Sequence, residues 1–298
     1  MDRNTVSLLL VSSTLIALSG VRSVPPATAD LPTPIVKQVD HIWLLVDEPQ
    51  YLFSLLTETL QLPVDWSLRN YRGFKSGGVV AGNVALEVLR LGEPKAASPP
   101  ENVRARLAGL AFEPYPLPSS LAELTRRGIP YTPLSPYTGG WIVRKTLWTT
   151  VGLTDFSSDN AYVFLCEYNP DYRDSQRVRG KWQRQLRGKQ GGALGVRSVQ
   201  KIVVGATDLA AETARWQNLV APTNPSAPGV WKLGDGPAIH LVSHTENAIR
   251  ALVLEVLSLE KAEAFLQQNG MLGTRSGRDI TLEPSRIQGL EIRLVETQ

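Results

Sequence analysis

Apolar and polar positions alternate along this chain in a pattern that returns several times. The first occurrence opens with a strand-like apolar run at residues 38–46, and leucines at helical spacing follow within residues 48–60. Three further short runs with strand-like composition lie at residues 64–71, 74–81 and 84–91. The pattern therefore predicts a unit of one strand, one helix and three strands.

The same order of elements is predicted once more, with strands after the helix at residues 131–137, 147–153 and 161–168. Two shorter units follow, each with two strands after its helix, near residue 231 and at residues 238–243 in the third unit and at residues 280–282 and 290–295 in the fourth. The opening strands of these units are expected at residues 105–112, 199–204 and 251–257, and their helices at residues 117–127, 209–220 and 259–269. Strands that gather after each helix, instead of alternating with helices, argue against a parallel Rossmann or barrel fold. No glycine-rich phosphate loop lies between a strand and a helix. The sequence predicts an α+β fold built from four repeated units.

The composition restricts the chemistry that these units can carry. The 298 residues contain one cysteine, Cys166, and three histidines, His41, His240 and His244. An internal disulfide and a cysteine-based zinc site are therefore excluded, and a metal site must rely on carboxylates unless all three histidines come together from distant strands. No G-x-S-x-G motif is present, which argues against a serine hydrolase. Cys166 falls within a predicted strand, so we do not expect a thiol nucleophile.

The first 29 residues have the composition of a secretory signal. An apolar stretch, Val6 to Leu18, precedes Ala27-Thr28-Ala29, which is a small-residue cleavage pattern. The stretch is too short and too polar for a stable transmembrane helix. We expect residues 1–29 to be a signal peptide and the mature protein to be periplasmic or secreted, with no stable membrane span. A cytoplasmic location follows if the segment does not function as a signal.

A basic segment divides the chain at residues 170–195. Residues 170–190 hold seven Lys or Arg against two Asp, so the rest of the chain is slightly acidic although the overall charge is +3. The basic character thus belongs to one segment and does not indicate a nucleic-acid surface. We interpret the segment as a linker helix whose arginines, among them Arg173, Arg177, Arg184 and Arg187, are exposed to solvent.

Several short motifs resemble those of the vicinal oxygen chelate superfamily and its glyoxalase-like domain proteins. They are Val39-Asp40-His41-Ile42 on an opening strand, Gly73-Phe74-Lys75-Ser76-Gly77-Gly78-Val79, Gly82-Asn83-Val84-Ala85-Leu86-Glu87 on a closing strand and, in the second unit, Gly109-Leu110-Ala111-Phe112-Glu113-Pro114 and Phe164-Leu165-Cys166-Glu167-Tyr168. The resemblance implies four βαβββ-type modules paired into two glyoxalase/bleomycin-resistance/dihydroxybiphenyl dioxygenase-like domains. These would span residues 36–169 and 196–298, with the linker helix between them.

In such proteins two paired modules enclose a cup that holds a divalent metal or a ligand. The resemblance implies His41, Glu87 and Glu167 as metal ligands, because relatives place His or Gln on an opening strand and Glu on a closing strand. Mn, Fe, Ni or Zn would suit one imidazole and two carboxylates. The opening strand of the second module, around Gly109, has no matching ligand. A family member that no longer binds a metal would also have such an incomplete set of ligands.

Strand alternation assigns side chains to the two faces of the expected sheet. Successive side chains point to opposite faces, so His41 is expected to share a face with Val39 and Trp43. Glu167 is expected in the cup, and Cys166 would then point away from it. Six aromatic residues are candidates to line the cup, although a place in the apolar core is the simpler interpretation for most of them: Trp43, Trp66, Tyr71, Phe74, Trp141 and Trp148.

Three functions remain open at this point. A metal-dependent lyase or isomerase of the glyoxalase type would act on a small molecule with vicinal oxygens, and Glu87 or Glu167 would transfer a proton as the catalytic base. A non-catalytic resistance-type protein would bind a small hydrophobic molecule in an aromatic cup. An extradiol dioxygenase normally needs two His and one carboxylate, and the second His is missing. A homodimer is left open for all three.

Overall fold

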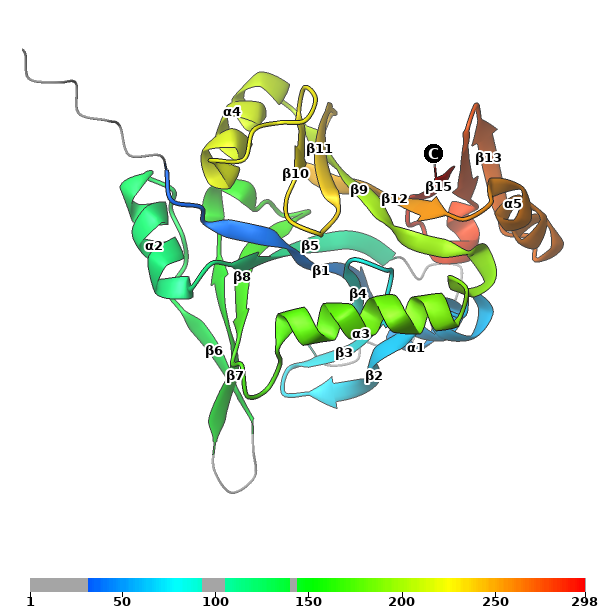
Figure 1. The fold of residues 1–298 in the computed structure, drawn as a ribbon, viewed down its shortest axis with the longest axis horizontal. Helices are drawn as coiled ribbons and strands as arrows, with labels where there is room; N and C mark the ends of the chain where they lie inside the picture. Colours follow the sequence, from blue (N-terminus) through cyan, green and yellow to red (C-terminus); the bar gives the residue numbers. More distant parts are fainter. Residues whose placement is uncertain (1–31, 93–104, 140–143, 298) are drawn as a thin grey trace, which may run out of the picture. The chain divides into compact units, whose positions relative to one another are not determined.

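The computed structural model describes residues 32–92, 105–139 and 144–297. The expected signal peptide and Trp141 lie outside these ranges. Within them, the strands form one sheet of eight strands and one of seven, shown in Figure 1. None of the helices in the described ranges is long and apolar enough to cross a membrane.

The eight-stranded sheet contains the first two sequence units. The first unit consists of β1 (Val36–Val46), α1 (Pro49–Ser54) with a continuing π-helical turn η1 (Leu55–Thr59), β2 (Val64–Tyr71), β3 (Phe74–Val80) and β4 (Ala85–Leu91). The second consists of β5 (Ala105–Pro114), α2 (Leu117–Arg126), β6 (Ser135–Gly139), β7 (Lys145–Gly152), a 3₁₀ turn η3 (Thr154–Phe156) and β8 (Tyr162–Tyr168). The strand order is β2-β3-β4-β1-β5-β8-β7-β6. The opening strands β1 and β5 are antiparallel neighbours, and each pairs in parallel with the closing strand of its own unit.

The seven-stranded sheet repeats this arrangement with the last two units. The helix α3 (Ser175–Gly188) and a 3₁₀ turn η4 (Gly192–Leu194) lead into it. The third unit consists of β9 (Val196–Ala206), α4 (Leu209–Val220), β10 (Val230–Lys232) and β11 (Ala238–Ser243). The fourth consists of β12 (Ala248–Val256), α5 (Leu259–Gln268), β13 (Leu272–Ser276), β14 (Asp279–Leu282), a 3₁₀ turn η5 (Pro284–Ile287) and β15 (Ile292–Glu296). Again the opening strands, β9 and β12, are antiparallel neighbours.

The four predicted units are present, with local differences. Helix α4 has the predicted bounds, whereas β13 was not predicted and β6 begins four residues later than the predicted strand at 131–137. Pro130 and Pro133 lie just before β6, and a proline has no N–H to donate to a strand neighbour. Pro136 is tolerated because β6 is an edge strand.

The two sheets share one large apolar core and several hydrogen bonds. Core side chains from both sheets belong to a single cluster, which includes Ile42 of β1 and Ile202 of β9. Asn83 donates a hydrogen bond to the carbonyl of Val199 and accepts one from its N–H, at 3.1 and 3.0 Å. On α3, Trp182 packs against Val80 and Ala85 of the first sheet. The division into domains at residues 36–169, 170–195 and 196–298 stays a prediction.

Candidate functional site

The first sheet curves around a cavity of about 280 Å³. Half of its lining residues are aromatic, and they come from both modules: Trp43, Trp66, Tyr71, Phe74, Tyr137, Trp148, Tyr162, Phe164, Tyr168 and Tyr172. The volume lies just below the ~300–1,000 Å³ that is typical of ligand pockets. All five of the predicted aromatic candidates in the described ranges therefore line the cup.

Aromatic rings from the two modules meet at one side of the cavity. Tyr71 and Phe74, which flank the turn between β2 and β3, stack at 4.7 Å between ring centroids. Tyr137 of β6 contacts both rings edge-on at 6.2 and 5.9 Å and stacks on Trp148 of β7 at 4.2 Å. Side chains of two hairpins that are far apart in the sheet order thus form one continuous aromatic wall.

A second aromatic cluster lies on the central strands. Trp43 of β1 packs against Tyr162 and Phe164 of β8, with centroid distances of 5.6 and 4.6 Å. The Trp43 ring occupies the space over Gly109 of β5, where an added Cβ would lie 2.5 Å from the indole. Glycine at this strand position is therefore required by the close approach of the ring.

Polar groups line the cavity between these clusters. Nδ1 of His41 lies 2.7 Å from Oδ2 of Asp40, and Nε2 lies 3.3 Å from Oε2 of Glu87. The Ser76 hydroxyl donates to the other oxygen of Glu87 at 2.6 Å and accepts a hydrogen bond from the Trp66 indole N–H at 3.0 Å. The structure thus brings together His41 and Glu87, two of the three predicted metal ligands.

A β-bulge at Asp40 interrupts the alternation of side chains along β1. In the pairing of β1 with β5, Val39 lies opposite Phe112 and His41 lies opposite Ala111, so Asp40 is an extra residue. The insertion changes the alternation, and Val39 belongs to the main apolar core while His41 lines the cavity. The prediction that Val39 shares the face of His41 was therefore wrong.

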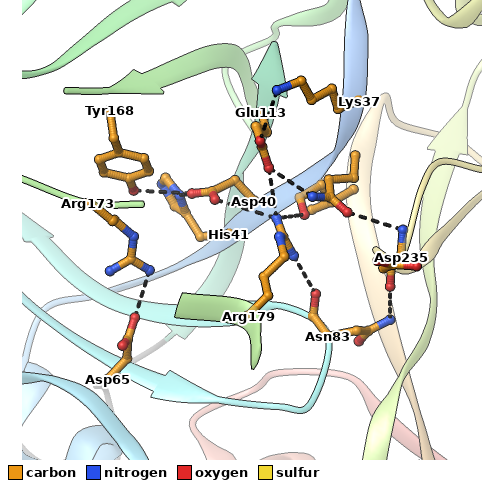
Figure 2. A network of polar contacts seen from close by, with 12 residues as sticks. Lys37, Asp40, His41, Asp65, Asn83, Glu113, Tyr168, Arg173, Arg179 and Asp235 are labelled. Carbon is orange, nitrogen blue, oxygen red and sulfur yellow. Dashed lines mark hydrogen bonds and ion pairs between the residues drawn. The ribbon is translucent and has the colours of Figure 1, made fainter. Parts of the chain in front are cut away.

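Asp40 is a buried carboxylate that is stabilised by its neighbours. Its residue is 2% exposed, and burial by itself favours the neutral acid. The hydrogen bond and electrostatic attraction of His41, together with the positive charges of Arg173 and Arg179, outweigh burial and lower the pKa of Asp40 to about 2. The Tyr168 hydroxyl also donates to it at 3.1 Å, as Figure 2 shows. Asp40 therefore fixes the orientation of the His41 ring.

Two arginines complete the polar network of Figure 2. Arg179 of α3 donates to the carbonyls of Val39 and Asn83 at 3.0 and 2.8 Å and lies 3.6 Å from a carboxylate oxygen of Asp40. Arg173, just before α3, donates to Asp65 at 2.8 Å and lines the cavity. The prediction that Arg173 is solvated was wrong, because its side chain is only 15% exposed.

Glu167 lies apart from the other predicted ligands. It accepts a hydrogen bond of 2.8 Å from the N–H of Leu117, the first residue of α2. On β8 it is Phe164, Cys166 and Tyr168 that face the cavity, and Glu167 is absent from the lining residues. The predicted orientation of β8 was therefore inverted, and Cys166 faces the cup. Burial raises the pKa of the Cys166 thiol well above its usual value, so the thiol stays protonated and unreactive.

The donor set of the described residues does not fit the expected divalent metal. His41 and Glu87 together supply two ligands, and Asp40 is bound to the opposite nitrogen of the imidazole ring. Catalytic zinc sites in proteins typically use three protein ligands. In residues 32–92, 105–139 and 144–297, no three His, Cys, Asp or Glu side chains lie together in a way that could hold one ion.

Comparison with solved structures identifies the fold class. The chain is similar to a hypothetical protein from Staphylococcus aureus, with a TM-score of 0.58 and 10% identity over 87% of this chain and 99% of that one. It is also similar to the 2,3-dioxygenase LapB from Pseudomonas sp. KL28, with a TM-score of 0.55 and 12% identity over 89% and 93% of the two chains. A variant of homoprotocatechuate 2,3-dioxygenase from B. fuscum gives a TM-score of 0.55 and 10% identity over 90% and 73%.

These likenesses confirm the predicted α+β fold class, in which paired βαβββ-type modules form curled sheets as in the 2,3-dioxygenases. No protein-family model matches the chain. No curated protein matches it either. At 10–12% identity the similarity to the solved structures concerns the fold alone.

Proposed function

We propose that this protein is a non-catalytic, glyoxalase-like member of the vicinal oxygen chelate superfamily that binds a small, flat aromatic molecule. The observation that carries this proposal is the cavity of about 280 Å³ in which ten of twenty lining residues are aromatic. Stacked and edge-on ring contacts stabilise such arrangements by ~0.5–1.5 kcal/mol per pair beyond their buried area. A flat aromatic ligand would extend the stacks already present in the wall.

The polar residues of the cavity support binding more than catalysis. His41 is engaged with Asp40 and faces Glu87, and Glu87 accepts a hydrogen bond from Ser76. Cys166 lines the cavity as a buried thiol whose pKa is raised by burial, so it supplies no nucleophile. The few polar groups can therefore orient a ligand, while the aromatic walls supply the contact area.

A pair of probes with the same skeleton tests the proposal. Biphenyl-4-methanol is aromatic, and bicyclohexyl-4-methanol has the same connectivity without π-systems. We expect the aromatic probe to bind at least ~10-fold more tightly in calorimetric titrations. Its rings can stack on the aromatic wall, whereas the saturated rings of bicyclohexyl-4-methanol make only less specific apolar contacts. Trp148→Ala should remove this preference, whereas Tyr51→Ala, at a side chain 55% exposed on α1, should retain it. Equal affinity for the two probes, or no binding of either, would overturn the proposal.

A metal-dependent enzyme is the second candidate, and one observation favours it. A metal-bound histidine usually donates its other ring N–H to a carboxylate, as His41 could to Asp40. One of the similar structures is a substrate complex of homoprotocatechuate 2,3-dioxygenase with 3,4-dihydroxyphenylacetate. If this chain were a dioxygenase, or a lyase or isomerase for vicinal oxygens, Glu87 would be the carboxylate of the cavity lining that could act as a base.

Elemental analysis separates the two candidates. The protein would be purified without a histidine tag and assayed for Mn, Fe, Ni and Zn. The binding proposal predicts far less than one equivalent of any of them, because two donors hold a divalent ion weakly. One equivalent of metal that is lost in His41→Ala would favour the enzyme and contradict non-catalytic binding.

A further inference from the structure

The cavity contains a carboxylate that the surrounding protein neutralises incompletely. Glu87 projects from the middle of β4 and its side chain is 13% exposed. One of its oxygens accepts the Ser76 hydroxyl, which is a neutral donor. In the described ranges, His41 is the only basic side chain within ion-pair distance of Glu87, and that contact is 3.3 Å, compared with 2.7 Å between His41 and Asp40. The imidazole is thus bound more closely to the other carboxylate.

In the tautomer of His41 that donates from Nδ1 to Asp40, the geometry between His41 and Glu87 calls for a hydrogen-bond donor. When Nδ1 carries the ring proton and donates it to Asp40, the lone pair of Nε2 faces Oε2 of Glu87. Two acceptors then face each other at the edge of the cavity, and neither is satisfied by the other. A group with several N–H bonds and a positive charge satisfies both atoms at once, because an ammonium has three donors.

The other charges around the cavity are already paired. Arg173 donates to Asp65 at 2.8 Å. Arg179 lies 3.6 Å from both Asp40 and Glu113. Each of these guanidinium groups thus has carboxylate partners of its own, and neither is within ion-pair distance of Glu87. An anionic ligand would have to compete with Asp65 for Arg173, whereas a cationic ligand would find Glu87 available.

The rings of this region already hold one cation. The guanidinium of Arg173 lies 5.1 Å from the ring centroid of Tyr168, 5.4 Å from that of Trp182 and 5.8 Å from that of Trp66. Tyr168 and Trp66 are themselves lining residues of the cavity. Aromatic faces within ~6 Å attract cations through their quadrupole. The walls are therefore compatible with a positively charged ligand as well as a flat one.

From this arrangement we infer that the ligand is an arylalkylamine in its protonated form, whose ammonium group binds between Glu87 and His41 while its rings stack on the aromatic walls. This inference rests on the proposed binding function and specifies the chemical class of the ligand. It assigns Glu87 as the residue that determines selectivity for charge. Ser76 holds the carboxylate of Glu87 in place through the hydrogen bond of 2.6 Å.

Three probes with one biphenyl skeleton test the inference at pH 7. They are 4-phenylbenzylamine, which is a cation, biphenyl-4-methanol, which is neutral, and biphenyl-4-carboxylate, which is an anion. We expect the cation to bind at least ~10-fold more tightly than the neutral probe and the anion to bind most weakly, because hydrogen bonds to a charged group are stronger than neutral ones. Affinities would be measured by calorimetry with the wild-type protein.

Two variants assign the preference to a residue. Glu87→Gln keeps the size of the side chain and an oxygen that accepts from Ser76, but it removes the charge. It should reduce the affinity for the amine by about 10-fold or more and leave that for biphenyl-4-methanol within ~2-fold. Glu58→Gln, at an exposed glutamate of the same module, should leave both affinities unchanged. Unchanged affinity of the neutral probe also shows that Glu87→Gln is folded.

The outcomes distinguish the inference from the proposed function. If none of the probes binds, the proposed function itself fails. If the alcohol and the amine bind equally and Glu87→Gln changes neither, the cavity binds aromatic molecules but the inferred ligand class is wrong, because His41 already neutralises Glu87. Tightest binding of the carboxylate would also overturn the inference and would assign charge selectivity to Arg173.

Discussion

Replacing Asp40 by asparagine removes one negative charge from the polar network beside the cavity. Asparagine has nearly the same shape, and its amide oxygen can still accept hydrogen bonds from His41 and Tyr168. What Asp40→Asn loses is the electrostatic attraction of the carboxylate to His41 and to the positive charges of Arg173 and Arg179. The variant therefore measures how strongly this charge stabilises the folded protein.

The size of the effect follows from the pKa of Asp40. Although burial favours the neutral acid, the hydrogen bond with His41 and the nearby positive charges lower the pKa from 3.8 to about 2. At ~1.4 kcal/mol per pH unit, this lowering corresponds to about 2 kcal/mol of folding free energy. Because the folded pKa lies below the unfolded one, the contribution is complete above pH 4 and is lost as the pH falls towards 2.

Urea unfolding, followed by tryptophan fluorescence at a series of pH values, tests this prediction. At pH 7 Asp40→Asn should lower the free energy of unfolding by about 2 kcal/mol, and the difference from the wild type should shrink between pH 4 and pH 2. Asp47→Asn, at an exposed aspartate, should change stability by less than ~0.5 kcal/mol. A pH-independent difference, or a variant as stable as the wild type, would refute the reasoning.

Three other variants or reactions test the packing. Arg127, with a side chain 4% exposed, donates hydrogen bonds to a carboxylate and to backbone carbonyls of distant segments, so Arg127→Leu should lower the free energy of unfolding in urea by ~3 kcal/mol or more. The control Arg126→Leu, at a side chain 60% exposed, should lower it by less than ~0.5 kcal/mol. Equal losses in the two variants would contradict this reasoning. Gly109→Ala should displace Trp43 and reduce the free energy of unfolding by ~1–3 kcal/mol. Unchanged tryptophan fluorescence and unchanged affinity for biphenyl-4-methanol would contradict the close contact between Gly109 and the Trp43 ring. Cys166, whose thiol pKa is raised by burial, should react with Ellman's reagent only after unfolding, and rapid reaction of the native protein would disprove its burial.

The repeated fold could be predicted from the sequence because its signals are local. Leucines at helical spacing and short apolar runs depend on neighbouring residues, and they predicted α4 with its observed bounds and the opening strands of all four units within a few residues. The bulge at Asp40 is different, because one extra residue on β1 is visible only from its pairing with β5. Alternation alone therefore placed Val39 on the wrong face.

The orientation of β8 could not be predicted because both of its faces are apolar. Val163 and Leu165 pack into the main core, while Phe164 and Cys166 pack at the cavity. Alternation identifies which side chains share a face but gives no sign of which face is the cavity. The family resemblance placed Glu167 in the cup, whereas the side chain lies at the start of α2.

The sequence contained a signal for the buried side of α3, but the high Lys and Arg content of the segment favoured the interpretation of an exposed linker. Arg179, Trp182 and Leu186 occur at helical spacing and form the buried side of the helix. The many other Lys and Arg residues of the segment made it resemble a solvated linker. A buried arginine on the apolar stripe of a helix usually has a polar partner in the core, and here Arg179 binds the strand that carries His41.

A crystal structure of the protein with biphenyl-4-methanol tests the central claim most directly. We expect both rings of the probe to lie in the cavity against the aromatic wall that contains Trp148, with the hydroxyl group directed toward His41 and Glu87. The distances from His41 to Asp40 and Glu87 should stay close to 2.7 and 3.3 Å. A probe bound elsewhere on the protein, or a metal ion held by His41, Glu87 and a third side chain, would contradict the account.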